Sequence, residues 1–462
     1  MTNYPSVILR LGSHAEKEYF EKLAKSLDGM LFASNLLEIT PAATATFVLG
    51  MKSKRGGEPI PFYLDPMTYM FGPYIDPKTG RRRTDLEALK SMQSKERGSK
   101  EKVKRLKQSY VKVSDVLGTA FANSAKHEKA IDPSTLTPAN RDRLCREVID
   151  YQTSRVTDIL SSDDFMKRHA ANCLPSAVFA PYFYIADEWA EQGIETALDL
   201  AKRSTSIDQE LPVHAVIVAS PAILRSENHR DSIVNGMKKA RVAAVWLWFN
   251  GFDELEAPQD DLAAFRELVT RLSTNCDVYN RHGGYFSLLL YHDGLKGISH
   301  GVGYGERKEV AQVIGAAAPS VRYYLPPIAK RIGVPEIQRC FSDLGITTPH
   351  DFFTQVCGCT ICRGVIGNDI QRFRAFGEMH RAGPTSTRDS QTPAAAKMCR
   401  FHFLINRMKE RGEVASLAAD QRGEHISSRA EDWRDLVPLE KHLGRPGTDG
   451  YLERWSSVFS DK

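Results

Sequence analysis

The hydrophobic pattern of the chain alternates between short apolar runs and longer segments with helical spacing. The first run, residues 6–11, reads Ser-Val-Ile-Leu-Arg-Leu, and the segment 14–27 after it has the spacing of an amphipathic helix. From residue 176 onward the strand–helix alternation is regular. The predicted strands are 6–11, 30–39, 60–65, 176–185, 213–219, 243–249, 278–282 and 297–304. The later predicted helices are 187–202, 230–239, 261–272 and 285–292.

Repeated strand–helix units with nearly continuous apolar strands predict a parallel sheet that is buried on both faces. Eight such units predict an α/β protein with a (β/α)₈ TIM-type barrel. A doubly wound sheet is the alternative, but no G-x-G-x-x-G follows a strand, and the glycines of 301–305 lack a helix start at the right place. Residues 1–320 are assigned to the barrel, with a basic helical insertion at about 76–170.

The amino-acid composition limits the class of protein to which the chain can belong. Hydrophobic residues make up 42% of the chain and charged residues 26%, which is ordinary for a globular protein. No stretch approaches the roughly 20 apolar residues that span a bilayer, and the N-terminus lacks a signal-peptide pattern. Eight cysteines in this length do not suggest a disulfide framework. We therefore expect a cytoplasmic protein with no membrane partner.

Positive charge is concentrated in one region. The net charge is +5, but residues 78–107 contain twelve Lys or Arg and only four Asp or Glu. Such clusters bind nucleic-acid phosphates through counterion release, although a solvated helix or loop would look similar. The candidate nucleic-acid contacts are Arg81, Arg82, Arg83, Lys100, Lys104 and Arg105.

The strongest chemical motif is Cys357-Gly-Cys359-Thr-Ile-Cys362, read together with His402 at the start of a late helical segment. Three thiolates and one imidazole form the closed tetrahedral set of a structural zinc site. Cys399 and His380 are the alternatives for the fourth ligand, and buried or redox-active cysteines are the alternative to a metal. A zinc-binding subdomain with the final barrel helix is assigned to 321–410, and 411–462 is a C-terminal tail without a functional interpretation.

Two carboxylates follow predicted strands, at the end of a barrel where active sites lie. Asp65 ends the third strand and Asp253 follows the sixth. Such a pair suits chemistry at a sugar anomeric carbon, with one nucleophile and one group that moves protons. The alternative for each is a helix cap or turn. Weaker catalytic candidates are Asp187, Asp293 and Asp351. Candidate substrate contacts near the same rim are Tyr69, Asn250, His282 and His300.

The cysteine motif and its histidine are similar to the zinc signature of the tRNA-guanine transglycosylases. Residues 64–71, Leu-Asp-Pro-Met-Thr-Tyr-Met-Phe, lie where that family has an Asp-Ser-Gly-Gly-Phe motif, and the resemblance implies its proton-handling role for Asp65. Those enzymes are (β/α)₈ barrels with a zinc subdomain after the last strands. The chain most resembles the branch that acts on DNA, the 7-deazaguanine DNA transglycosylases, because the family's RNA-binding domains are not recognisable in it.

The resemblance implies a pentosyltransferase that replaces guanine in DNA with a 7-deazaguanine base, such as 7-cyano-7-deazaguanine, through a covalent aspartyl-glycosyl intermediate. It implies structural zinc as the cofactor, and helper proteins of a DNA-modification system as partners. The tRNA enzymes carry their nucleophilic aspartate on the last barrel strand, which here reads Gly-Ile-Ser-His-Gly over 297–301. Asp253 is therefore the expected nucleophile.

Three other functions remain open. The first is the same exchange in tRNA, and the second is a non-catalytic, zinc-stapled barrel that binds nucleic acid. The third, a metal-dependent hydrolase, is disfavoured because the strand ends offer no His-x-His ligand cluster.

Overall fold

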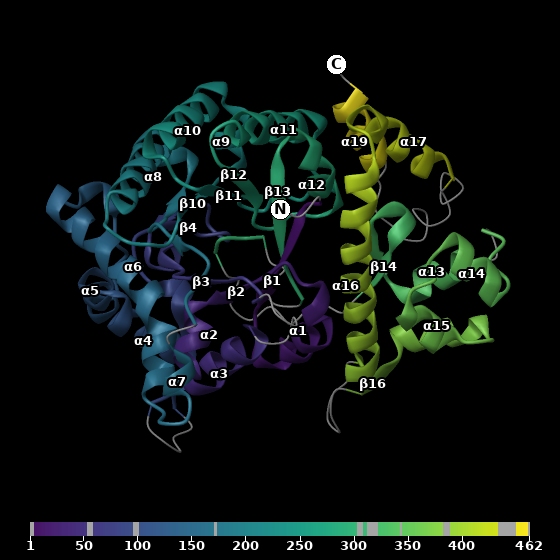
Figure 1. Ribbon diagram of the computed structural model, residues 1–462, viewed down its shortest axis with the longest axis horizontal. Coiled ribbons are helices and arrows are strands. Elements are labelled where there is room, and N and C mark those ends of the chain that lie inside the picture. Colours follow the sequence, from purple (N-terminus) through teal and green to yellow (C-terminus); the bar gives the residue numbers. More distant parts are fainter. Residues whose placement is uncertain are drawn as a thin grey trace. The chain divides into compact units, whose positions relative to one another are not determined.

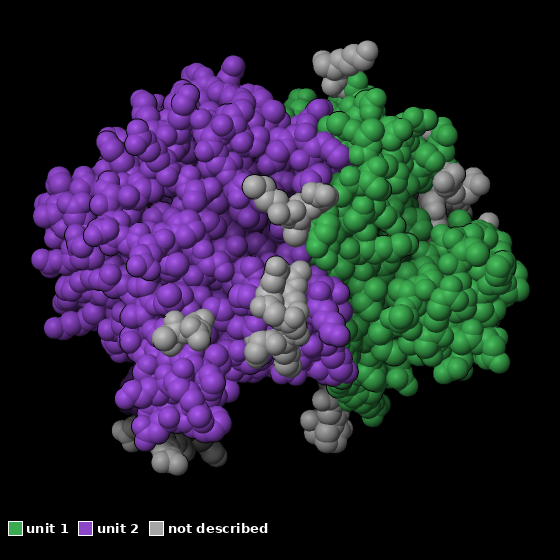
Figure 2. Space-filling view, viewed as in Figure 1, with its two compact units in different colours: residues 1–5, 253–263, 317–462 green, residues 6–252, 264–316 purple. Residues whose placement is uncertain are grey.

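The structure of the chain is a computed structural model, shown in Figure 1. It describes residues 4–52, 59–95, 101–170, 173–302, 308–311, 322–341, 344–381, 389–432 and 450–460. The chain divides into two compact units, which Figure 2 colours separately. The barrel unit consists of Ser6–Phe252 and Ala264–Ala316, and the C-terminal unit of Met1–Pro5, Asp253–Ala263 and Ala317–Lys462.

Parallel strands of the barrel unit form a sheet that nearly closes on itself, which confirms the predicted α/β barrel. Its order is β3-β2-β1-β13-β12-β11-β10-β8, and β9 also pairs with β10, so β8 and β9 together occupy the fourth of eight positions. Beside β8 and β3 the Ser176 amide donates to the Phe62 carbonyl over 2.8 Å. The strands are β1 (Ser6–Leu11), β2 (Gly29–Ala33), β3 (Phe62–Asp65), β8 (Val178–Phe179), β9 (Tyr184–Ile185), β10 (Val213–Ala219), β11 (Ala244–Phe249), β12 (Asp277–Asn280) and β13 (Leu295–Gly301).

Helices alternate with these strands along the chain, as the repeated pattern predicted (Figure 1). In α8, for example, Ile194, Leu200 and Ala201 are buried on one face while the opposite face is solvated. The helices are α1 (Lys17–Leu23), α2 (Ser34–Ile39), α3 (Pro41–Lys52), α6 (Pro138–Ser161), α8 (Ala190–Thr205), α9 (Pro221–Arg225), α10 (Glu227–Ala240), α11 (Gln259–Ser273) and α12 (Tyr285–Leu289). In the part of the chain that the structure describes, none of the helices is both long and apolar enough to cross a bilayer.

Two predicted strands are shorter than expected. The strand expected over 30–39 ends at Ala33, and Ser34–Ile39 is helix α2 instead. An apolar run alone does not distinguish a buried strand from a buried helix, which explains the error. The strand expected over 176–185 is interrupted between β8 and β9. Pro181 lies in this gap, and proline has no amide hydrogen to donate to a sheet ladder.

The predicted helical insertion at 76–170 has a different structure in its basic part. The residues there form two antiparallel hairpins, and helices follow only from Gln108. The elements are β4 (Tyr74–Ile75), β5 (Arg82–Arg83), β6 (Lys90–Ser94), β7 (Lys102–Leu106), α4 (Gln108–Leu117), α5 (Thr119–His127) and α7 (Lys167–Ala170). The apolar residues of β7, Val103 and Leu106, are three positions apart and lack the two-residue period of a strand, so the pattern gave no signal for this hairpin.

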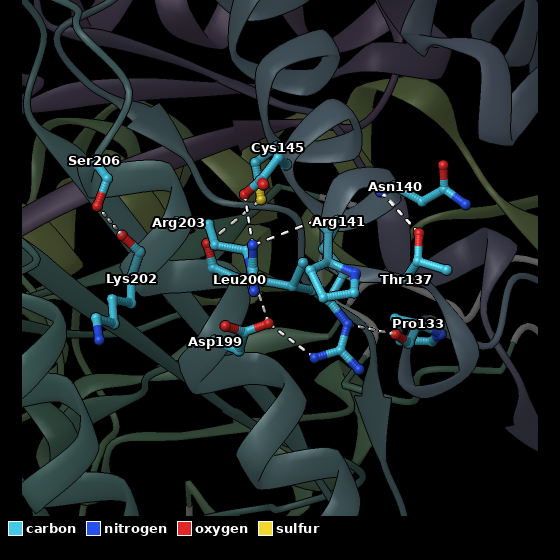
Figure 3. A network of polar contacts seen from close by, with 12 residues as sticks. Pro133, Thr137, Asn140, Arg141, Cys145, Asp199, Leu200, Lys202, Arg203 and Ser206 are labelled. Atoms are coloured by element: carbon cyan, nitrogen blue, oxygen red, sulfur yellow. Dashed lines mark hydrogen bonds and ion pairs between the residues drawn. The ribbon is translucent and has the colours of Figure 1, made fainter.

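Helix α6, also inside that predicted insertion, belongs to the barrel itself. Its Gln152 side chain donates to the Phe179 carbonyl over 2.8 Å and accepts from the Phe179 amide over 2.7 Å. These two bonds satisfy the backbone of the short strand β8, where the sheet is interrupted. Figure 3 shows how α6 is joined to α8: Arg141 of α6 pairs with Asp199 of α8 over 2.8 Å, and Arg203 of α8 also pairs with Asp199 over 2.8 Å.

Aromatic side chains fill one layer inside the barrel. Trp246 stacks on Tyr279 with ring centroids 4.7 Å apart, and its indole nitrogen donates to His214 Nδ1 over 3.1 Å. Tyr63 and Phe179 complete the layer from β3 and β8. Burial lowers the pKa of His214 to about 4, so this ring stays neutral in the apolar layer.

The C-terminal unit is mostly helical and includes the predicted tail. Trp455 near the C-terminus donates its indole N–H to the Glu254 carbonyl over 2.8 Å, and the Tyr451 hydroxyl donates to the Ile328 carbonyl over 2.5 Å. The elements are β14 (Tyr323–Leu325), β15 (Lys330–Ile332), α13 (Val334–Cys340), α14 (Pro349–Gln355), α15 (Thr360–Ile366), β16 (Met379–Arg381), β17 (Asp389–Gln391), α16 (Pro393–Ser416), α17 (Arg422–Asp432) and α19 (Tyr451–Ser460). The tail therefore takes part in the packing of this unit.

The aromatic layer makes a testable prediction for stability. Replacing Trp246, which is 0% exposed, with Ala should lower the free energy of unfolding by about 3–5 kcal/mol, because it leaves a large interior cavity. Urea unfolding followed by far-UV circular dichroism measures the change. The control is Phe165→Ala, at a side chain that is 67% exposed. Equal effects of the two variants would contradict the assignment of Trp246 to the interior.

Candidate functional site

Asp65 lies at the carboxyl end of β3 and is held by three groups. Its Oδ1 accepts the Met67 amide over 3.0 Å and the Tyr182 hydroxyl over 2.5 Å, and its Oδ2 forms an ion pair with Arg281 Nη2. Met67 has a φ of 54°, an unusual conformation for a residue with a side chain. The carboxylate is 1% exposed, so it is a buried, fully bonded acid rather than a surface cap.

Arg281 reaches Asp65 from the residue after β12, across the barrel interior. Its guanidinium is 0% exposed and lies 5.5 Å from the ring centroids of both Tyr182 and Trp248. Tyr69, a predicted substrate contact, stacks on Tyr182 with centroids 5.6 Å apart and meets Trp248 edge-on at 4.9 Å. The structure thus brings Tyr69 into the surroundings of Asp65, where aromatic faces also stabilise the buried guanidinium.

The two predicted histidines lie near the ends of β12 and β13. Arg10 Nη1 lies 2.9 Å from Nε2 of His282, which is buried. Burial, and then the charge of Arg10, holds the pKa of His282 well below its ordinary value, so the imidazole is neutral and accepts from Arg10. His300 is half-buried, and its Nδ1 donates to the Gly301 carbonyl.

An open cavity lies where β9, β10 and β11 end, at the carboxyl-terminal mouth of the barrel. Its volume is about 960 Å³, counting the space open to solvent. Asn250, a predicted substrate contact, lines it and is oriented by the Val310 amide, which donates to Oδ1 over 2.8 Å. Asp187 and Ser220 line it too, and the Ser220 hydroxyl donates to Asp187. The cavity therefore presents amide, hydroxyl and carboxylate groups together.

Tyr184 links this cavity to the surroundings of Asp65. It lines the cavity two residues after Tyr182, the residue whose hydroxyl donates to Asp65. The Asn250 side-chain amide lies 3.5 Å from the Tyr184 hydroxyl. Burial raises the pKa of Tyr184 to about 12, and the nearby charge of Asp187 adds to the shift. The phenol is therefore a neutral hydrogen-bonding group at neutral pH.

Asp253, the predicted nucleophile, begins the segment that groups with the C-terminal unit. Its Oδ1 accepts the Leu255 amide over 3.1 Å, which is the turn arrangement considered as its alternative. Asp65 belongs to the other unit. That the two carboxylates face each other therefore stays a prediction. Among the other candidate acids, Asp187 and Asp293 share the barrel unit with Asp65, and Asp293 pairs with Arg266 over 3.0 Å.

The predicted nucleic-acid contacts are spread over the two hairpins. Arg82 pairs with Asp132 over 2.9 Å and lies 4.6 Å above the Trp189 ring, and Arg83 pairs with Asp85. Lys104 pairs with Glu87, whereas Arg81 and Arg105 are exposed. Lys100 lies outside the described residues. Part of the positive charge is thus matched within the hairpins, and the exposed part remains available to phosphates.

The four predicted metal ligands converge in the C-terminal unit. One donor atom from each of Cys357, Cys359, Cys362 and His402 lies within 4.8 Å of the others. The cysteines surround the start of α15, and Cys359 is its N-cap, while His402 comes from α16. The set could hold a metal ion and is compatible with zinc.

Neighbouring groups orient the histidine of this cluster. His402 Nε2 donates to the Tyr324 carbonyl over 2.6 Å, which leaves Nδ1 facing the sulfurs at 3.3–3.9 Å. The Tyr323 ring stacks on His402 with centroids 4.1 Å apart, and its hydroxyl lies 3.1 Å from Cys362 Sγ. Histidines that bind metals usually donate the N–H of the other ring nitrogen to a partner such as this carbonyl.

The alternative ligands lie elsewhere. The Cys399 thiol donates to the Phe376 carbonyl over 3.3 Å, and Cys399 is not among the four clustered residues. His380 is exposed on β16. His402, the first choice for the fourth ligand, is thus the histidine that completes the cluster.

Sequence reasoning missed the partners of Asp65. Arg10 lies inside the apolar run of β1, and Arg281 directly follows the buried end of β12. A charged residue in a strand buried on both faces must find a partner in the interior. That anomaly was the available signal for both arginines, whereas Tyr182 and Trp248 were indistinguishable from core residues.

No protein-family model matches the chain, and no curated protein matches it in sequence. The functional assignment therefore rests on the residues and geometry described above.

The cluster predicts a bound metal. We expect the purified chain to contain about one zinc ion, and Cys362→Ser to lose it because a tetrahedral set lacks one thiolate. Elemental analysis by mass spectrometry after dialysis measures the content. Cys399→Ser, which removes a buried thiol outside the cluster, is the matched control and should retain the metal. Equal metal loss in both variants would contradict this ligand set.

Proposed function

We propose that the chain is a base-exchange transglycosylase that replaces guanine in DNA with a 7-deazaguanine. The observation that carries the proposal is Asp65, buried at the carboxyl end of the third barrel strand, the same end of the strands at which an open cavity lies. Active sites of such barrels lie at this end. The lining of the cavity by Asp187, Ser220 and Asn250 suits the polar edge of a purine.

The proposed reaction needs one carboxylate at C1′ of the target nucleoside. Its oxygen forms a bond to C1′ while the N-glycosidic bond breaks, and guanine leaves with the electron pair and takes up a proton. The incoming 7-deazaguanine then loses its ring N–H proton, and that nitrogen displaces the carboxylate from C1′. In this scheme Asp65 moves the protons, and the base exchange needs no redox group and no nucleoside triphosphate.

Two acids compete for the nucleophilic role. Asp253 is the candidate from strand order, but its side chain caps its own turn. Asp187 lines the cavity in the same unit as Asp65, and Ser220 donates to it. We retain Asp253 as the first candidate for the nucleophile and take Asp187 as the alternative. A variant of each residue distinguishes the two assignments.

In this proposal the Cys₃His cluster holds structural zinc. Four protein ligands leave no open coordination position for a substrate or an activated water. The metal would join the loop before α15 to helix α16, two elements that are distant in sequence. Its contribution is to the stability of the C-terminal unit rather than to the chemistry.

A second function, nucleic-acid binding without catalysis, is favoured by one specific observation. Both oxygens of Asp65 are engaged, one by Arg281 and the other by Tyr182 and the Met67 amide. An acid that transfers protons must release at least one of these partners when substrate binds. The exchange of tRNA bases is a further alternative, since phosphate contacts carry little information on the identity of the polymer.

Base exchange is the first prediction of this proposal. Incubation of the chain with labelled guanine and duplex DNA, single-stranded DNA or bulk tRNA should place label in DNA. Flipping a base out of a duplex costs a few kcal/mol, so single-stranded DNA should react at least as fast unless helper proteins are present. Label in tRNA alone would move the activity to RNA, and absence of label from every polymer would favour the binding function.

The acids are separated by three variants of that assay. Asp65→Asn should lower the exchange rate by about 10²–10⁴-fold, the usual contribution of a positioned proton-transfer group. A covalent DNA adduct, resolved on a denaturing gel, should be absent in the variant that removes the nucleophile. An adduct that persists in Asp253→Asn and is lost in Asp187→Asn would transfer the role to Asp187. Asp231→Asn, at a surface ion pair of α10, is the control.

The hairpins predict a salt-dependent affinity. Lys102→Ala and Arg105→Ala, at exposed positions of β7, should each weaken binding of any DNA sequence to a similar extent. Each should lower the slope of log affinity against log salt by about one. Fluorescence anisotropy between low and moderate salt measures both quantities. Lys239→Ala, at an exposed lysine of α10, is the control; unchanged slopes in the hairpin variants would remove the hairpins from the interface.

A further inference from the structure

The interior ends of β12 and β13 contain polar groups that the base-exchange proposal does not use. Arg281 is 0% exposed, and one of its nitrogens, Nη2, pairs with Asp65. Its Nε and Nη1 are buried and have no hydrogen-bond partner among the residues that the structure describes. Buried donors without partners are costly, and in a native protein they call for an explanation.

Ser299 on β13 is in the same situation. It is 0% exposed, and its hydroxyl has no partner within the described ranges. The strand register pairs Asn280 with Ile298, so the next residues along, Arg281 and Ser299, are neighbours on adjacent parallel strands.

The direction of the Ser299 side chain follows from its own register partner. Ser299 pairs with Ile8, and Ile8 pairs with Gly29. A Cβ at Gly29 would lie 3.3 Å from the Ile8 side chain and 3.5 Å from that of Tyr63, which belongs to the interior aromatic layer. Register partners in a parallel sheet point to the same face. Ser299 therefore faces the barrel interior on the side of Arg281.

Two guanidinium groups lie close together at this place. Arg10 at the end of β1 adds a second guanidinium, and both burial and the charge of Arg281 lower the pKa of Arg10. His282, which accepts from Arg10, is neutral. The guanidinium of buried Arg281 and that of half-buried Arg10 thus both lie near the carboxylate of Asp65.

We propose that Arg281, Ser299 and Arg10 form a binding site for a phosphoryl anion. The unpartnered Nε and Nη1 of Arg281 are donors of the planar fork that recognises phosphate oxygens. Ser299 adds a hydroxyl donor, and Arg10 adds charge. The site lies at strands seven and eight of the barrel, where barrels of this kind frequently bind phosphate. The phosphoryl group belongs either to a nucleic-acid backbone or to a small phosphorylated ligand.

The test measures binding of inorganic phosphate to the full chain by isothermal titration calorimetry, with chloride added to equal ionic strength. The wild-type chain should bind one phosphate. Arg281→Lys, which keeps the charge and removes the fork, should bind about tenfold more weakly, and so should Ser299→Ala. The controls are Arg271→Lys and Ser232→Ala, whose side chains bond to Glu267 and to the Asn228 carbonyl at the surface.

Ser299→Ala removes a single buried hydroxyl with no described partner, so it should fold even if Arg281→Lys does not. Circular dichroism verifies folding of each variant. Competition then identifies the source of the phosphoryl group: displacement of phosphate by a short oligodeoxynucleotide indicates a backbone phosphate, and displacement by deoxyguanosine monophosphate alone indicates a small ligand. Absence of phosphate binding by the wild-type chain, or equal affinity in Ser299→Ala, overturns the proposal. The site does not depend on base exchange, since phosphate binding is measured without it.

Discussion

The buried pair of Asp65 and Arg281 is the constraint on which the mouth of the barrel depends. It joins the third strand to the seventh across the interior, and neither side chain is exposed by more than 2%. Removing two charges from water costs several kcal/mol per ion, and their attraction offsets this only with further hydrogen bonds. Tyr182, the Met67 amide and the face of Trp248 supply those contacts. A phenol, a backbone amide and an indole ring are therefore arranged around this pair.

The same pair separates two layers with different chemistry. Below it, His214, Trp246 and Tyr279 form an aromatic layer in which a histidine stays neutral because of its burial. At the mouth, guanidinium, carboxylate and phenol groups bond to one another. Alternation along each strand generates the layers, since Trp246 and Trp248, two residues apart on β11, both point inward. The buried ion pair thus lies at the carboxyl-terminal ends of its strands.

Much of the fold could be predicted from the sequence because the barrel strands are short, continuously apolar and separated by helical spacing. The expected strand 213–219 coincides with β10, and 243–249 differs from β11 by one residue. The error over 30–39 arose where an apolar run continues from strand into helix. The hairpins at 74–106 were missed because strands such as β5 and β7 do not alternate polar and apolar residues with a period of two.

The metal cluster could be predicted from the sequence, whereas the partners of Asp65 could not. Three cysteines within six positions predict a metal site, because their short spacing brings the sulfurs together. A histidine on helix α16 completes the set. Arg281 lies 216 residues from Asp65. Its contact exists only because eight strands close with a particular register, which no local pattern encodes.

Closure of the barrel also determines the charge balance, and this connects the proposed anion site to the proposed chemistry. Arg281 gives one nitrogen to Asp65 and has two others without described partners. An anion that engaged those two would share the guanidinium with Asp65 and weaken its hold on the carboxylate, because one cation would then face two anions. An acid that is sealed in the resting chain would become available for proton transfer only when a phosphorylated substrate is in place. The engagement of both Asp65 oxygens in the chain without substrate is then consistent with proton transfer that begins only after the substrate has bound.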